Sequence, residues 1–592
     1  MVRKTMDRIE ELKTYRSALK ANPWDTTGKA RTIEQTWDFC DYVSLPHKYS
    51  HPEMQPWMSN NSHPMIMAKS ETALAVIISK NPEIETSARL PIFAKKERLL
   101  DSLYDFTWDK GNGRQQLIKF VYNGAKYGTA IGREYHKFKK ETRVTITGYD
   151  PEKGKHTTEE EETVTHDEPY FEVLPIRDCY VDNRARPYDE DSIRDWCWTV
   201  EYDMSTFLKE FPEEKYKNAK YVKGYLKDKK DKAEVEVGSN GKKVALWFYE
   251  DKENNQFIIT DGEVLLYSDF LLNGELSLVI FMWKMRNDFT IYGLSLPEVL
   301  ENDQEMKDRI MNMSLNQVIL AISGSGFYGG TGDLTERDAK LEPKLKKLKD
   351  AEKIIFPKVP NVDFVTLQML DRIDNEADNN SGVTKSLGGE QVGKTLGEAV
   401  LNREAGLSRL SLPLQNLEFA LERHARLRID NIQRIYSRPV RTELATDELG
   451  NIVSEKLWNE YTEERAKLAK AGKNPEQEPS FNDKFAIDGN KVMRNQFRTL
   501  RMKEARTEEG EAQATGGDKW LEITPSEIMG EFDVKIRAMS TIPMSKALEE
   551  AKALETFNIV AKLPYTDLYK AQQKLLRARQ LEPDDWMLTE QQ

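Results

Sequence analysis

Cysteine and long apolar runs are the two features that this sequence lacks most clearly. It holds three cysteines (Cys40, Cys179 and Cys197) in 592 residues. Such sparse usage excludes the disulfide framework of small secreted domains and indicates a protein that folds in a reducing compartment. The longest apolar runs, Leu74–Ile78 and Leu276–Trp283, are far shorter than the ~18 residues of a membrane helix and suit core segments. The charged N-terminus has no apolar stretch, so we expect no secretory signal and no membrane association.

An excess of positive charge is also absent. The chain carries 87 lysines and arginines against 99 aspartates and glutamates, which gives a formal net charge of −12. Proteins that grip DNA are usually basic, because neutralising phosphates supplies most of the non-specific affinity. An acidic chain therefore either does not contact DNA or lets DNA slide past it. The composition is that of a large globular, helix-rich protein, and its length suits about four regions of roughly 150 residues.

Catalytic constellations are scarce. One segment, residues 388–395 (GGEQVGKT), matches the phosphate-binding pattern G-x-x-x-x-G-K-[ST] and precedes a predicted helix. A P-loop must leave a buried parallel strand, yet residues 374–385 are polar and acidic, and no later strand ends in the Asp or Glu that Mg²⁺ needs. Cysteine and histidine spacings match no familiar metal site. We therefore interpret the segment as a glycine-rich loop and predict no enzyme, no cofactor and no metal.

The distribution of apolar residues predicts an α+β fold. Short apolar or alternating runs predict strands at 144–147, 171–174, 196–200, 244–250, 257–260, 264–267, 278–282 and 532–536. A spacing of 3.6 residues predicts helices at 62–80, 115–131, 296–322 and 396–436. Pro413 lies inside the last of these helices and should kink it. The charged stretch at 152–162 is expected to be a solvated hairpin or loop.

The helix expected at 296–322 is apolar on two faces. Met306 and Met313 lie on one face, Leu315 and Ile322 lie on another, and a polar stripe runs between them. A helix of this kind packs against neighbours on both sides. A ring of identical subunits would supply those neighbours, and so would the interior of an ordinary globular domain.

The order of several segments resembles the portal family of tailed bacteriophages. Residues 120–133 (FVYNGAKYGTAIGR) resemble a wing helix in which glycine precedes a strand, and residues 292–307 (YGLSLPEVLENDQEMK) resemble the start of the first stem helix. Further similar segments lie at 61–85, 173–182, 193–198, 207–212, 381–399 and 530–536. The likeness covers most of residues 60–580, whereas the first 60 residues and residues 438–520 match nothing that we can place.

This resemblance implies a portal fold with a domain plan in seven segments. They are the wing at 1–292 and 396–544, the stem helices at 293–322 and 361–380, the clip at 323–360, the tunnel loop at 381–395 and the crown at 545–592. It implies a homo-oligomeric ring, usually a dodecamer, at one vertex of the capsid in the virion, made in the bacterial cytoplasm. Double-stranded DNA would pass through the ring during packaging and ejection.

The resemblance also implies partners and surfaces. The ring would contact the major capsid protein and a scaffolding protein, then the terminase motor, and later head-tail adaptor and tail proteins. Candidates to face DNA are Lys385, Glu390, Gln391 and Lys394 in the tunnel loop and Asp371, Asp374 and Asp378 in the stem. Negative charge there would keep phosphates from sticking. Candidates in the clip for docking the motor or an adaptor are Lys344, Lys346, Lys347 and Lys349.

Two other classes of protein remain open from the sequence. A P-loop ATPase, perhaps the packaging motor itself, would bind ATP and lose that binding on Lys394→Ala. A different structural virion protein, such as a head or tail-tube subunit, is the other alternative. The long kinked helix and the interrupted stem disfavour that alternative.

Overall fold

The fold is known from a computed structural model, in which the chain is α+β. The residues that it describes are 2–24, 30–50, 54–78, 84–150, 155–212, 216–222, 243–253, 255–260, 264–270, 274–323, 326–329, 345–348, 364–385, 387, 406–436, 440–443, 485–488, 491–496, 499–502, 519–522, 528–536, 554, 557–560, 572 and 575–576. The contacts, burial and surfaces given for the molecule are those of these residues.

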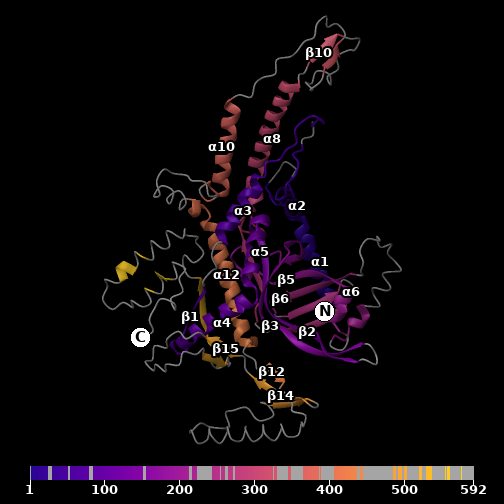
Figure 1. Cartoon of the computed structure of the whole chain (residues 1–592), viewed down its shortest axis with the longest axis vertical. Coiled ribbons are helices and arrows are strands. Elements are labelled where there is room, and N and C mark those ends of the chain that lie inside the picture. The colour runs from indigo at the N-terminus through magenta and orange to yellow at the C-terminus, as the bar shows by residue number, and fades with distance from the viewer. Residues whose placement is uncertain are drawn as a thin grey trace.

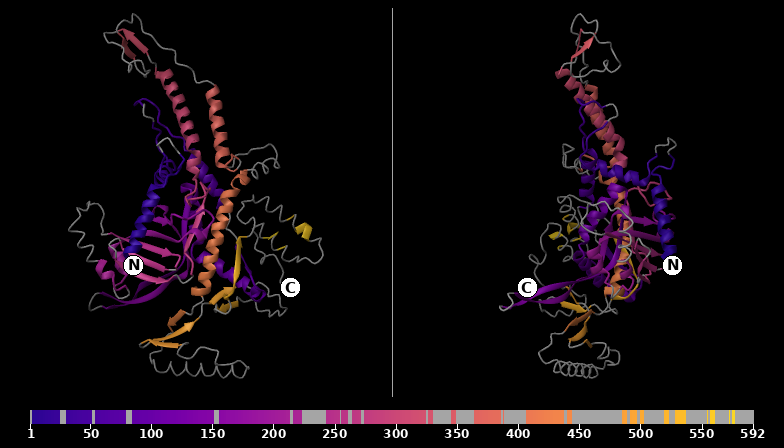
Figure 2. Two further views of the ribbon diagram at one scale, coloured as in Figure 1. Left: turned by 180° about the vertical axis from the view of Figure 1, so that it is seen from behind. Right: turned by 90° about the vertical axis from the view of Figure 1, so that its right-hand side faces the viewer.

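A body of sheets and helices carries a long arm of two helices (Figure 1). The arm consists of α8 (Leu296–Ser323) and α10 (Phe364–Ser381), which run side by side in all three views (Figures 1 and 2). A parallel pair of strands, β10 (Gly326–Gly329) and β11 (Leu345–Leu348), lies beyond the outer end of α8. The helix expected at 296–322 is therefore confirmed.

The centre of the body is a three-stranded antiparallel sheet in the order β3-β2-β9. β9 (Leu278–Met282) confirms the strand expected there, and it pairs with the first residues of β2 (Thr129–Asp150). β2 and β3 (Lys155–Leu174) form one long hairpin. The strands predicted at 144–147 and 171–174 are therefore parts of much longer strands. Strand pairing satisfies the backbone whatever the side chains are, so a charged strand leaves no apolar pattern to read.

A five-stranded antiparallel sheet lies beside this centre. Its strands follow one another in space as they do in sequence: β4 (Cys179–Val181), β5 (Asp195–Asp203), β6 (Lys243–Asp251), β7 (Asn255–Thr260) and β8 (Leu265–Phe270). Three stacked rings, Trp196, Trp198 and Phe248, join β5 to β6. The strands expected at 196–200 and from 244 to 267 are confirmed.

Helices and short strands complete the described part of the chain. The helices are α1 (Val2–Ala18), α2 (Ile33–Val43), α3 (Met65–Ile77), α4 (Glu97–Lys110), α5 (Gly113–Tyr127), α6 (Met204–Glu210) and α12 (Ser411–Asn431). Short 3-10 helices are η1 (Pro91–Lys96), η2 (Ile176–Asp178) and η3 (Glu190–Ser192), and the π-helix η4 (Ile432–Tyr436) follows α12. The strands are β1 (Ile84–Ala88), β12 (Val440–Glu443), β13 (Phe485–Asp488), β14 (Lys491–Gln496), β15 (Thr499–Met502), β16 (Lys519–Glu522) and β17 (Phe532–Ile536).

The helix expected at 115–131 ends earlier than its apolar pattern suggests. Gly128 has φ +82°, a left-handed conformation that ends α5. A Cβ at Gly128 would lie 2.4 Å from the carbonyl oxygen of Gly293, so only glycine fits this close approach. The chain then enters β2 at Thr129, and Ile131 belongs to a strand.

The long helix expected at 396–436 is interrupted near its proline. Residues 406–409 are helical, Leu410 is a turn, and α12 begins at Ser411. Pro413 has no N–H to donate to the carbonyl of Arg409, and it is tolerated here because it lies in the first turn of α12. Residues 396–405 lie outside the described part.

Two segments far apart in the sequence close the body. β1 pairs with β17 in an antiparallel register that places Thr86 opposite Val534. Both strands pack against the main core, which also takes in α12 and α5. Among the described helices, none combines the length and the apolar character needed to cross a bilayer.

Candidate functional site

The polar stripe of α8 binds a segment of its own chain. Asp308 accepts hydrogen bonds from Ser62 Oγ (2.9 Å) and the backbone N–H of His63 (2.6 Å). Asn312 accepts from Ser59 Oγ (2.8 Å) and returns a hydrogen bond to the carbonyl of Asn61 (2.6 Å). Asp308 and Asn312 are both buried. These polar residues therefore hold residues 59–63 against the arm. The sequence had revealed the polar stripe on this helix but not the segment that it binds.

Two of the acidic candidates on α10 form internal ion pairs. Asp374 lies 2.5 Å from Lys307 Nζ of α8. Asp378 is buried and pairs with Lys69 of α3. Asp371, one of the candidates to face DNA, is exposed. Asp374 and Asp378 therefore hold the base of the arm together, and the free negative charge on this stretch of α10 is smaller than the sequence suggests.

The start of the expected tunnel loop is held by the end of α10. Gly382 has φ +77° and its N–H bonds to the carbonyl of Asp378, which closes the helix. The backbone N–H of Lys385 reaches Asp378 Oδ2 at 3.3 Å, and the Lys385 side chain is exposed. Glu390, Gln391 and Lys394, together with the rest of the P-loop match, lie outside the described residues.

The tip of the arm contains two of the four clip lysines. Lys346 and Lys347 belong to β11, opposite Phe327 and Tyr328 of β10. These two lysines therefore lie on a strand, β11. Lys344 and Lys349 lie outside the described part of the chain.

Apolar side chains remain exposed along the arm. Met306 is 51% exposed and Ile322 is 81% exposed on α8, and Met369 of α10 is exposed as well. Nothing in the described residues covers them. A helix that keeps such side chains in water has surface available for a neighbouring molecule.

A fully buried charged cluster lies inside the body, and sequence reasoning missed it. Glu134 of β2 is bound by His424 Nε2 (3.0 Å) and by Arg428 Nε (3.1 Å) of α12. Tyr104 Oη lies 3.2 Å from His424 Nδ1. A neutral His424 protonated on Nε2 satisfies both contacts, because Nδ1 then accepts from the tyrosine. The four side chains join three elements at the centre of the core.

The electrostatics of this cluster favour an ionised glutamate and a neutral histidine. Burial alone would raise the pKa of Glu134, but Arg428 and His424 outweigh burial and hold that pKa below its ordinary value. Burial lowers the pKa of His424, and the positive charge of Arg428 lowers it further. A cavity of about 290 Å³ borders Glu134. The side chains of Glu134, His424 and Arg428 are nevertheless fully buried against one another, so we interpret the cluster as a structural ion pair.

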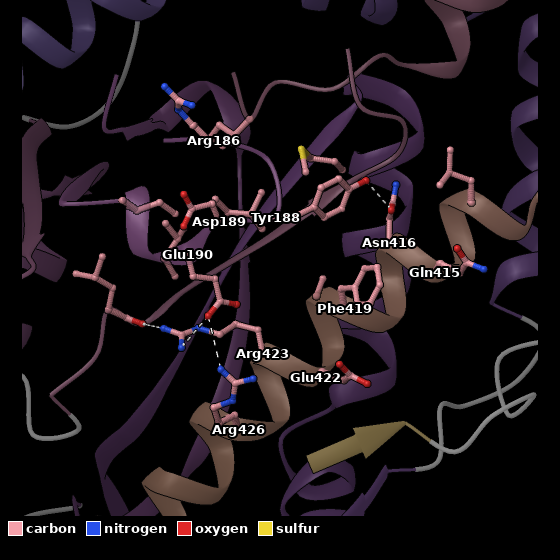
Figure 3. Close-up of a pocket in the computed structure, with 18 residues that line it drawn as sticks. Arg186, Tyr188, Asp189, Glu190, Gln415, Asn416, Phe419, Glu422, Arg423 and Arg426 are labelled. Carbon is pink, nitrogen blue, oxygen red and sulfur yellow. Dashed lines mark hydrogen bonds and ion pairs between the residues drawn. The ribbon is translucent and has the colours of Figure 1, made fainter. Parts of the chain in front are cut away.

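A cavity of about 630 Å³ lies between α12, β9 and the loop from Arg186 to Ile193 (Figure 3). Leu278, Ile280 and Met282 line its apolar part. Charged side chains of both signs, including Glu190, Arg423 and Arg426, lie at its rim. Glu190 lies 3.3 Å from Arg423 and 3.7 Å from Arg426.

Tyr188 stands at the mouth of this cavity in a strained backbone conformation. Its φ is +57°, which is uncommon for a residue other than glycine, asparagine or aspartate. Its hydroxyl donates to Asn416 Oδ1 at 2.8 Å, and its ring meets Phe419 edge to face at 6.1 Å. No sequence pattern predicts a tyrosine in the left-handed conformation, so sequence analysis could not have identified this side of the cavity.

Comparison with known proteins adds no relative to this geometry. No protein-family model and no curated protein matches the chain. Within the described residues, no group of three or more His, Cys, Asp or Glu side chains could hold a metal ion. Function is therefore inferred from the fold and its surfaces.

Proposed function

We propose that this chain is a portal protein: the subunit of a ring, of about twelve copies, through which double-stranded DNA enters and leaves a phage capsid. The ring would also be the docking platform for the packaging motor and, later, for head-tail adaptor proteins. The observation that carries the proposal is the arm. Two helices leave a β-containing body side by side and end at a small strand pair, in the order that the resemblance implies for stem and clip.

The surface of the arm supports assembly with further copies. α8 is apolar on two faces, and Met306 and Ile322 stay exposed in the single chain. An exposed apolar helix face is stabilised when a second molecule covers it. In a closed ring, each arm would lie between two others, so both faces would be covered.

The charge of the chain supports passage of DNA without retention. The net charge is −12. A conduit must not bind phosphates tightly, because each neutralised phosphate would hold the DNA in place. We therefore propose a channel that contacts DNA weakly and without sequence preference.

Imaging of the purified protein by cryo-electron microscopy, viewed down any symmetry axis, tests this function. We expect a closed ring of about twelve subunits around a hole as wide as a DNA duplex. A six-membered ring that binds ATP would overturn the proposal in favour of the motor, and a tube or an icosahedral shell would favour another virion protein. The variant Lys394→Ala separates the portal from the motor. A portal ring should form as it does in the wild type, whereas a motor should lose its binding of ATP.

A further inference from the structure

A ring needs a head-to-tail contact, in which one surface of a subunit meets a different surface of the next. The inference of such a contact between the bodies of neighbouring subunits, away from the arm, rests on the proposed ring. Two apolar surfaces of the body have the placement of such a pair. One is the cavity beside α12, and the other is the outer row of α5.

The cavity has the anatomy of a protein-binding site. Leu278, Ile280 and Met282 line its apolar part. Tyr188 and Phe419 also line it, and both are exposed (Figure 3). Charges of both signs lie around the rim. An apolar centre within a polar rim is typical of an interface that receives an apolar anchor. A site for a phosphate-bearing metabolite would instead carry an excess of positive charge.

The strained Tyr188 is a second, independent sign of function at this mouth. Left-handed backbone costs free energy of the order of 1–3 kcal/mol at a residue with a side chain, and such strain clusters at binding sites. Here it presents a half-exposed ring at the rim, held by Asn416. Asn416 is itself buried, and its amide nitrogen contacts the carbonyl of Trp283 at 3.4 Å. The ring is therefore fixed in place before any partner arrives.

The complementary surface is a ridge on α5, formed by Arg114, Ile118, Tyr122 and Lys126. These residues are four apart and so lie in one row along the helix. Ile118 is 42% exposed and Tyr122 is 43% exposed. The α5 ridge is thus apolar in its middle. Lys126 at one end pairs with Asp41 (2.6 Å) and Glu190 at the cavity rim pairs with Arg423, so the match between the two surfaces rests on their apolar centres and not on opposite charge.

The cavity and the α5 ridge lie on opposite faces of one sheet. Phe281 of β9 points to α5, because its ring lies 5.6 Å from that of Phe120 and a Cβ on Gly124 would touch it. Leu278, Ile280 and Met282 alternate with Phe281 and so point the other way, into the cavity. Ile118 and Tyr122 lie on the outer side of α5, away from the sheet. The two surfaces therefore face away from each other, as a head-to-tail contact requires.

We propose that the α5 ridge of one subunit, with Ile118 and Tyr122 as anchors, inserts into the cavity beside α12 of the next subunit. Each copy then offers a ridge on one side and a cavity on the other. This contact joins neighbouring bodies, independently of any contact between arms.

Disulfide trapping tests the contact directly. The three native cysteines are buried, so they leave a low background. The test variant is the double substitution Tyr122→Cys and Phe419→Cys. The matched control pairs Tyr122→Cys with Phe138→Cys, because Phe419 and Phe138 are both 57% exposed and only Phe419 lines the cavity. Under mild oxidation, we expect a ladder of covalent multimers from the test pair and none from the control pair.

A second variant asks whether the cavity contributes to assembly. Phe419→Asp should raise the protein concentration for half-assembly at least about ten-fold, because the contact would bury an unpaired carboxylate where an apolar ring met the ridge. Phe138→Asp should leave it unchanged. Circular dichroism spectra that match the wild type show that each variant is folded.

The outcomes separate this contact from the ring itself. Rings in the microscope with equal trapping by the two cysteine pairs, or with Phe419→Asp assembling as the wild type does, would overturn the ridge-and-cavity contact and leave the portal proposal intact. A chain that forms no ring under any condition would overturn the portal proposal and this contact with it. Rings together with the test-pair ladder would support both.

Discussion

At the residue scale, Glu134, His424 and Arg428 form a buried charged cluster in the core of the body. All three side chains are fully buried, and Arg428 also lies over the rings of Tyr104 and Trp108. A buried ion pair adds little compared with apolar packing, but removing one partner leaves the other charge unpaired. The cluster is therefore far more sensitive to single changes than to paired ones.

Arg428→Met should lower the free energy of unfolding by about 3–5 kcal/mol, because it leaves the Glu134 carboxylate buried without its cation. Chemical denaturation followed by circular dichroism measures this loss. Arg426→Met, at a neighbouring arginine that is largely exposed, is the control and should change stability by less than about 0.5 kcal/mol. Equal losses in the two variants would show that burial of the ion pair has no special role.

Stability should fall as the pH is lowered, in two steps. The pKa of His424 is lowered in the folded protein, so below about 6.5 the unfolded chain takes up a proton that the folded chain refuses. The pKa of Glu134 is also lowered, so its contribution is full above about 4.5 and is lost as the pH falls through its folded pKa. The midpoint of thermal unfolding should therefore drop between about pH 7 and 5, and less so in His424→Gln. His63→Gln, at an exposed histidine, should keep the full drop.

At the scale of elements, α8 depends on the segment that its polar stripe fastens. Asn312→Leu removes the acceptor of the Asn61 N–H (2.9 Å) and the donor to its carbonyl. We expect a loss of about 1 kcal/mol, since two part-buried hydrogen bonds to the backbone of Asn61 are removed. Hydrogen exchange measured by mass spectrometry should show faster exchange at residues 59–63. The exposed Asn302→Ala should leave that exchange unchanged.

Several elements of the body and arm were predictable from the sequence, because their apolar residues follow a clear period. α8, β9 and the strands from 244 to 267 are examples. The β2–β3 hairpin was not, because its outer half is charged and its strand form comes from backbone pairing. Of the candidate site, α10 could be placed, but the pairing of Asp378 with Lys69 depends on residues more than 300 positions apart. No local pattern reports such contacts.

At the scale of the whole molecule, the proposed conduit should not bind DNA measurably at physiological salt. The net charge of −12 per chain opposes phosphate binding, so we expect no binding of a short duplex at micromolar protein and about 150 mM salt. Asp371→Lys should introduce a salt-dependent affinity that weakens from about 50 to 200 mM salt. Fluorescence anisotropy of a labelled duplex measures both. Asp191→Lys, at an exposed carboxylate of the body, is the control. Equal gains in the two variants would contradict an arm that faces DNA.

The pairing of β1 with β17 determines when this part of the body can fold during translation. Arg89 and Asp533, which bond beside these strands, are 444 residues apart. A ribosome that adds roughly 5–20 residues per second delivers β17 on the order of 20–90 s after β1. During that interval β1 is an open edge in a nascent polypeptide, and unpaired edges invite association with other chains. The β1–β17 pair cannot form until β17 has been synthesised, so a joint between subunits that needs this closed side of the body must form after that point.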